Sequence, residues 1–211
     1  MIAGERIDII KEKSKRIRRP LPALLFLLFL DCVVFAFVFS LHHVFRPDIL
    51  AIIVYLSLYV YLVLTKRKKD IVYLLISSIL AIAWTYFAKN NYGYNREMIH
   101  ILGLSAFPLF AWATGLAALY LVYHDLEQIF MKNNAWLKRF LLFTILYFFF
   151  IIVLETIAYH VFNIRNVATG VYDGLPVCDC IHAPRWMQVS YFLIGPIYFI
   201  ICRNYKLKII K

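Results

Sequence analysis

The chain has 211 residues, of which 63% are hydrophobic, 18% are aromatic and only 17% are charged, and its formal net charge is +11. So few polar side chains cannot cover the surface of one soluble domain of this length, which excludes a soluble globular enzyme. The composition instead indicates an all-α, polytopic membrane protein.

Six apolar windows, each close to the roughly 17 to 25 residues that a helix needs to cross a bilayer, predict six membrane spans. The chain is therefore expected to form a six-helix transmembrane domain over residues 21–202, followed by a basic tail at 203–211. The basic segment at 1–20 is either an amphipathic surface helix or a plain charged tail. The windows cover residues 21–41, 49–64, 71–88, 99–123, 140–162 and 187–202.

The positions of lysine and arginine predict the orientation. Of the 23 such residues, 18 lie before the first window, after the second, after the fourth and after the sixth. Because cytoplasmic loops carry the positive excess, both termini are expected in the cytoplasm, with the six-pass chain in the cell (inner) membrane. The cations also attract anionic membrane lipids. Their division among four short segments excludes a nucleic-acid interface.

This orientation brings cysteine and histidine residues together on the outer side. Cys178, Cys180 and His182, with His160 nearby, offer the thiolate and imidazole ligands of a zinc, copper or iron site. Alternatively, the two cysteines form a disulfide or a thiol-exchange site. A third interpretation makes the cysteines packing residues and the histidines membrane-interface residues.

Two carboxyl groups lie inside apolar windows, Asp31 in the first and Glu155 in the fifth. Ionisable residues in hydrocarbon are costly, so they usually face protein or water and serve a function. Burial favours the protonated form, so either group could act as an acid. Tyr159 follows Glu155 by four residues and lies on the same helix face. The alternative is a neutral carboxyl group hydrogen-bonded between helices.

Two segments resemble the membrane carotenoid-biosynthesis family, which contains carotenoid hydratases and the small lycopene cyclases. Residues 84–115 read WTYFAKNNYGYNREMIHILGLSAFPLFAWATG, and Glu155 is followed by a G-x-Y-x-G-x-P run from Gly170 to Pro176 and then by Trp186. The paired glutamates of the cyclases are absent. The resemblance implies a long isoprenoid or other lipid as a lipophilic substrate, with Glu155, Asp31, Tyr159 and Asp173 as catalytic candidates. The implied lining of its binding site is Tyr92, Tyr94, Trp112 and Trp186.

Three functions remain open at this point. The first is an integral membrane enzyme that hydrates, cyclises or isomerises an isoprenoid or another lipid by acid–base chemistry near the outer face. The second is a small-molecule-binding or transport subunit of a membrane complex. The third is a metal or thiol-redox protein acting at the outer face.

The charge distribution predicts that Arg67 and Tyr94 lie on opposite sides of the membrane. Single cysteines introduced at these positions, in a cysteine-free background, are expected to react with a membrane-impermeant thiol reagent from opposite sides. The same experiment should place Lys138 with Arg67 and Asp173 with Tyr94. Reaction of positions 67 and 94 from the same side would contradict the six-span topology.

Overall fold

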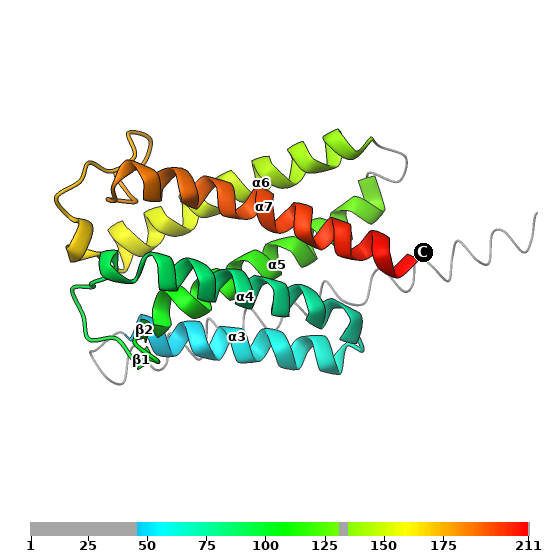
Figure 1. Ribbon diagram of the computed structural model, residues 1–211, viewed down its shortest axis with the longest axis horizontal. Helices are drawn as coiled ribbons and strands as arrows, with labels where there is room; N and C mark the ends of the chain where they lie inside the picture. The colour runs from blue at the N-terminus through cyan, green and yellow to red at the C-terminus, as the bar shows by residue number, and fades with distance from the viewer. Residues whose placement is uncertain (1–45, 131–134, 211) are drawn as a thin grey trace, which may run out of the picture.

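The structure, a computed structural model, describes residues 46–130 and 135–210. Within these ranges, five helices are long and apolar enough to cross a membrane, and they form an elongated bundle (Figure 1). The first predicted window, 21–41 with Asp31, lies outside the described residues, as does the basic segment at 1–20. The helices are α3 (Pro47–Leu64), α4 (Ile71–Phe87), α5 (Ala106–Phe130), α6 (Trp136–Thr156) and α7 (Arg185–Ile210).

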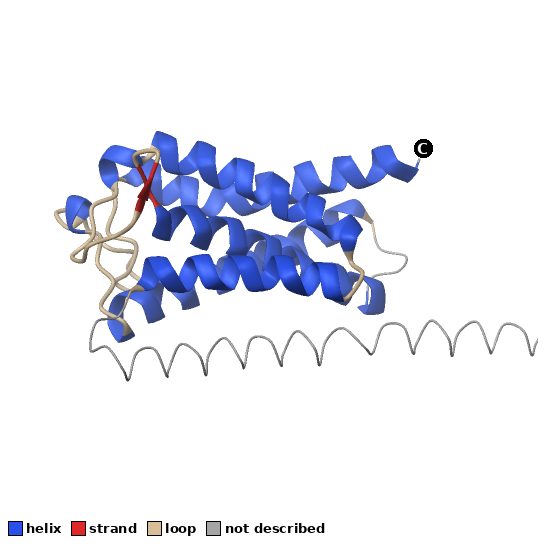
Figure 2. Ribbon diagram, turned by 90° about the horizontal axis from the view of Figure 1, so that it is seen from below, coloured by secondary structure: helices blue, strands red, loops and turns tan. Residues whose placement is uncertain are grey.

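Two long connections gather at one end of the bundle (Figure 2). The connection from α4 to α5 contains a 3₁₀ turn and a two-stranded hairpin, and the connection from α6 to α7 begins with a π-helical turn that extends α6. We call this the loop end. Its short elements are η2 (Lys89–Asn91), β1 (His100–Ile101), β2 (Leu104–Ser105), η3 (Ile157–Val161) and η4 (Val167–Thr169).

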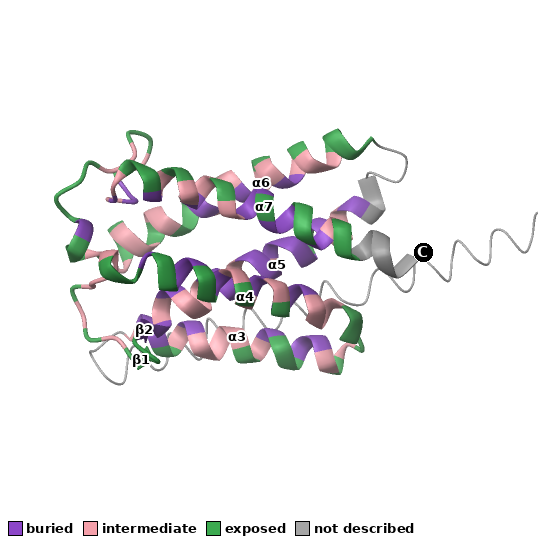
Figure 3. Ribbon diagram, in the orientation of Figure 1, coloured by how far each residue is buried: buried purple, intermediate pink, exposed green. Residues whose placement is uncertain are grey.

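Helix α5 lies at the centre of the bundle. In its apolar stretch 61% of the residues are buried inside the protein, against 17% for α6, whose outer surface faces the surroundings (Figure 3). Aromatic rings fill the space between α5, α6 and α7, with the Phe143 and Phe199 ring centroids 5.1 Å apart. The Tyr198 hydroxyl group donates to the carbonyl oxygen of Tyr73 at 2.9 Å, so this buried ring also has its polar atom satisfied.

Ion pairs fasten the helices at the end opposite the loops. Arg67, after α3, donates two hydrogen bonds to the Asp125 carboxylate of α5, at 3.0 and 3.1 Å. Glu127 of α5 pairs with Arg139 of α6 at 3.1 Å and with Arg203 of α7 at 3.0 Å. Hydrogen bonds between charged groups are stronger than those between neutral groups. Three of the arginines counted for the topology prediction, Arg67, Arg139 and Arg203, therefore also join helices.

The start of the fourth span was predicted wrongly. Residues 99–105 form the β1–β2 hairpin rather than helix, and α5 begins only at Ala106. The turn residues Leu102 and Gly103 have φ angles of 51° and 78°, the left-handed pair that a two-residue hairpin turn requires. The apolar sequence alone resembles a helix, but the Ile99 N–H donates to the buried Asp48 carboxylate at 2.7 Å, which fixes an extended chain.

Pro108 therefore lies in the first turn of α5. The first helical N–H groups have no partner within a helix, so proline is tolerated at this position. Pro196, in contrast, lies inside α7.

Close approach of α6 and α7 depends on Gly195. A Cβ atom added there would overlap the Tyr147 ring, whereas one added at Gly115 would meet only Phe150, at 3.8 Å. We expect Gly195→Ala to destabilise the protein by about 1–3 kcal/mol through overpacking. Gly115→Ala, the matched control, should be neutral or stabilising, because alanine favours helix over glycine.

Thermal unfolding in detergent checks this expectation. Equal melting temperatures for Gly195→Ala and Gly115→Ala would show that α6 and α7 do not pack through this glycine.

Candidate functional site

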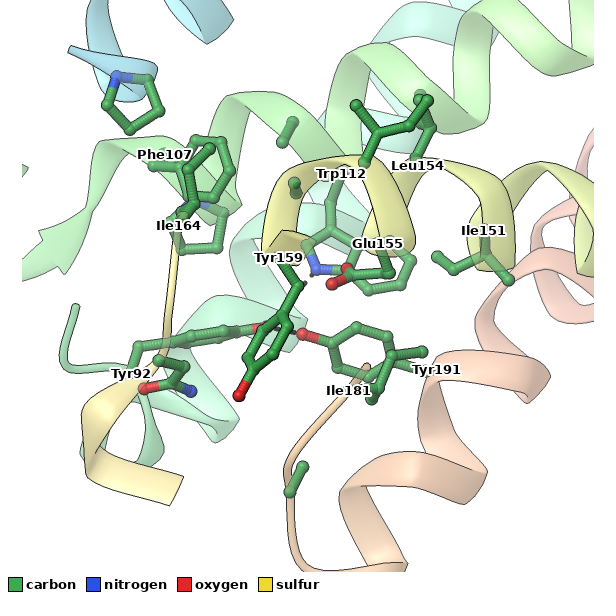
Figure 4. Close-up of a pocket in the computed structure, with 18 of the residues that line it drawn as sticks. Tyr92, Phe107, Trp112, Ile151, Leu154, Glu155, Tyr159, Ile164, Ile181 and Tyr191 are labelled. Carbon is green, nitrogen blue, oxygen red and sulfur yellow. Dashed lines mark hydrogen bonds between the residues drawn. The ribbon is translucent and has the colours of Figure 1, made fainter. Parts of the chain in front are cut away.

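A cavity of about 300 Å³ lies at the loop end, within the size range of small-molecule sites. Its walls come from α3, α5, α6 and α7 and from both long connections (Figure 4). Most of the lining side chains are aliphatic or aromatic. The cavity is called the outer pocket below, after the side of the membrane on which the charge distribution predicts the loop end. Six residues predicted as site residues line it: Tyr92, Tyr94, Trp112, Glu155, Tyr159 and His182.

Asparagine side chains join the two connections that form the roof of the outer pocket. Asn166 accepts a hydrogen bond from the Gly93 N–H at 3.0 Å and donates to the carbonyl oxygen of Asn91 at 2.6 Å. Asn95 makes the matching contacts with the other connection, accepting from the Arg165 N–H at 3.1 Å. The two segments on which the sequence resemblance rests are therefore adjacent in space.

Glu155 lies near the end of α6 and is half-buried. Figure 4 shows its carboxyl group facing the space bounded by Trp112, Tyr159 and Tyr191. Among the described residues, none forms a hydrogen bond or an ion pair with this carboxyl group. An unpaired polar group in apolar surroundings is costly, so the carboxyl group is available to a ligand.

Four aromatic side chains form a hydrogen-bonded group beside Glu155. The Trp84 indole N–H donates to the Tyr92 hydroxyl oxygen at 2.8 Å, and the Trp112 indole N–H lies 3.4 Å from the same oxygen. The Tyr92 and Tyr191 hydroxyl oxygens are 3.3 Å apart. Burial raises the pKa of Tyr92 to about 12, so this phenol keeps its proton at neutral pH.

A ring stack closes another side of the outer pocket. The rings of Tyr159 and His182 are stacked with centroids 4.8 Å apart, and the Arg165 guanidinium lies 4.9 Å from the Tyr159 ring centroid. His182 Nδ1 is 2.9 Å from the carbonyl oxygen of Tyr172, and Nε2 is 3.2 Å from that of Asp179. Tyr159 belongs to the π-helical turn η3, a feature often found at functional sites.

The predicted metal ligands do not assemble. Cys178 and Cys180 form a disulfide, as in the second interpretation of the sequence, so neither sulfur is available as a thiolate. His160 Nε2 lies 2.8 Å from the carbonyl oxygen of Cys178, and His182 contacts the backbone oxygens described above. Within residues 46–130 and 135–210, no three His, Cys, Asp or Glu side chains are placed to hold a metal ion.

Two other predicted residues lie outside the cavity wall. Asp173 is exposed, and its carbonyl oxygen accepts a hydrogen bond from Gln188 at 2.9 Å. Trp186 is 45% exposed, and its ring centroid lies 6.1 Å from that of Trp84, which belongs to the aromatic group beside the outer pocket. The predicted second acid, Asp31, lies outside the described residues.

Sequence reasoning missed two members of the aromatic group as site residues, Trp84 and Tyr191. Both lie in apolar windows, where aromatic residues are ordinary packing residues. A tyrosine or tryptophan in the middle of a span must find a hydrogen-bond partner, and that requirement was the available signal.

Comparison with protein-family models, with curated proteins and with solved structures finds no match. The site therefore has to be interpreted from its own chemistry.

Proposed function

We propose that the protein is an integral membrane enzyme that acts by acid–base chemistry on one end of an isoprenoid or a similar long lipid. The observation that carries the proposal is Glu155, whose carboxyl group has no partner among the described residues and lies on the wall of an aromatic-lined cavity of about 300 Å³. In this proposal the chain crosses the cell membrane six times, has both termini in the cytoplasm and opens its pocket at the outer face. The sequence resemblance to carotenoid-biosynthesis proteins points to the same class of substrate.

The proposed reaction begins with proton transfer from the Glu155 carboxyl group to one carbon of a substrate double bond. The π electrons form the new C–H bond, the other carbon becomes a carbocation, and Glu155 becomes a carboxylate. The cation then loses a proton to the carboxylate, which gives an isomerised product. Alternatively, a second double bond of the chain attacks the cation, its π electrons form the ring C–C bond, and the new cation loses the proton to the carboxylate, which gives a cyclised product. In hydration the cation adds water, whose proton returns to the carboxylate. The ring faces of Trp112, Tyr92 and Tyr159 are suited to stabilise the cation.

Lateral entry from the bilayer suits such a substrate. Leu154 and Ile157 line the outer pocket and are 45% and 38% exposed on α6, so the pocket wall reaches the surface that meets lipid. A long apolar chain can stay in the bilayer while its end occupies the pocket.

A second candidate function, thiol–disulfide exchange, is favoured by the position of the disulfide. Cys178 is partly exposed, whereas Cys180 is buried and directly precedes Ile181 and His182 of the pocket wall. A thiolate of a partner dithiol would attack the Cys178 sulfur and displace Cys180 as a thiolate. The second thiol of the partner would then attack the partner's own sulfur in the mixed disulfide and displace Cys178 as a thiolate. The partner leaves as a disulfide, and Cys178 and Cys180 are left reduced.

Replacement of Glu155 by Gln tests the acid–base proposal, because Gln keeps the shape but cannot exchange the proton. Wild-type protein in detergent and ²H₂O should incorporate deuterium into squalene or geranylgeraniol, measured by mass spectrometry. Glu155→Gln should reduce the rate by about 10²- to 10⁴-fold, the usual contribution of a general acid–base group.

The control is Glu97→Gln, the same substitution at an exposed residue outside the pocket, which should keep the wild-type rate. Thermal unfolding establishes that both variants are folded. Wild-type deuterium incorporation in folded Glu155→Gln would refute the acid–base role, and binding of a probe without any incorporation would favour a binding or transport subunit.

A further inference from the structure

The donors and acceptors around the Tyr92 hydroxyl group determine the direction of its hydrogen bonds. The indole N–H groups of Trp84 and Trp112 can only donate, and both point at the Tyr92 hydroxyl oxygen. These two bonds occupy both acceptor positions of that oxygen. The 3.3 Å contact between Tyr92 and Tyr191 must therefore use the Tyr92 hydrogen, with Tyr191 as the acceptor.

Because Tyr191 accepts the hydrogen bond from Tyr92, its own hydroxyl hydrogen has no acceptor among the described residues. Tyr92 is the single hydrogen-bond partner that the described part of the chain offers to this hydroxyl group. Tyr191 also lines the outer pocket, beside Glu155 (Figure 4). An unmet donor in apolar surroundings is unfavourable, so the pocket is built to receive an acceptor atom there.

We infer that the ligand carries a hydroxyl group on its buried end, which accepts a hydrogen bond from Tyr191 and donates one to Glu155. The inference rests on the proposed function and narrows its ligand class to a long isoprenoid alcohol, as substrate or product. Tyr191 is thereby a specificity-determining residue. Tyr92 and Trp84 are positioning residues, because they act on the ligand only through the direction that they impose on the Tyr191 hydroxyl group.

A hydroxyl group fits this pair better than other oxygen groups. It accepts a hydrogen bond from Tyr191 and donates one to an oxygen of the Glu155 carboxyl group, so both unpaired groups are satisfied at once. A carbonyl oxygen accepts from Tyr191 but has no hydrogen to donate to a Glu155 oxygen, and a hydrocarbon end offers neither. A site that hydrogen-bonds a ligand hydroxyl group discriminates strongly against the analogue that lacks it.

Binding of three matched probes tests the inference: geranylgeraniol, geranylgeranial and the hydrocarbon of the same skeleton without oxygen. Quenching of tryptophan fluorescence reports binding, because Trp112 lines the outer pocket. The wild-type protein should bind the alcohol about 10- to 100-fold more tightly than the hydrocarbon, as expected for an unmet polar group, with the aldehyde between them.

Tyr191→Phe should lower the affinity for the alcohol about 10-fold or more and leave that for the hydrocarbon unchanged. Tyr92→Phe, which removes the constraint on Tyr191, should reduce the alcohol-to-hydrocarbon ratio by less. Tyr59→Phe, on the exposed side of α3, should keep the wild-type ratio. The ratio responds to hydrogen bonding at the ligand and not to a general loss of stability.

Equal affinity of the wild type for alcohol and hydrocarbon would overturn the inference, as would binding of none of the three probes. An unchanged ratio in both Tyr191→Phe and Tyr92→Phe would do the same. These outcomes are distinct from failure of the proposed function, because deuterium incorporation into squalene requires Glu155 and no ligand hydroxyl group.

Discussion

The site depends on the hydrogen bonds between the two long connections at the loop end. Asn166 and Asn95 satisfy backbone groups of the opposite connection, which would otherwise lack partners near the apolar part of a membrane. These hydrogen bonds hold Tyr92 close to the first turns of α5, where its hydroxyl group meets the indole N–H groups of Trp84 and Trp112. Without these hydrogen bonds, the two connections would not be held together over the cavity beside Glu155.

The two ends of the bundle use polar residues differently. At the end opposite the loops, acids and cations are paired, as in Glu127 with Arg139 and Arg203, and the pairs join three helices. At the loop end, the described part of the chain offers no partner to the Glu155 carboxyl group and none to the Tyr191 hydroxyl hydrogen. Paired groups stabilise a fold, whereas unpaired ones inside a cavity are suited to a ligand.

Much of the fold follows from apolar length alone, because a span needs enough consecutive apolar residues to cross the bilayer. The windows at 49–64, 71–88, 140–162 and 187–202 all coincide with helices. The window at 99–123 began seven residues early, since the contact between Asp48 and Ile99 that fixes the hairpin joins residues 51 apart in the chain. Apolar composition does not encode such long-range pairs.

The candidate site was predictable in part. An acidic residue in an apolar window is a strong signal, and it identified Glu155. Tyr191 carries no comparable signal, because its importance comes from the hydrogen bonds that three distant aromatic residues impose on it. Cys178 and Cys180 form a disulfide in this structure, and their spacing alone does not distinguish a disulfide from two thiolate ligands of a metal.

We expect a lipophilic molecule to occupy the outer pocket of the purified protein. Mass spectrometry of extracted molecules tests this expectation, with Ala111→Phe to fill the cavity and Ala83→Phe, exposed on α4, as the matched control. One lipophilic compound should accompany the wild type and the control in near-equimolar amount and should be lost from Ala111→Phe. The same extracted molecules in all three proteins would contradict it.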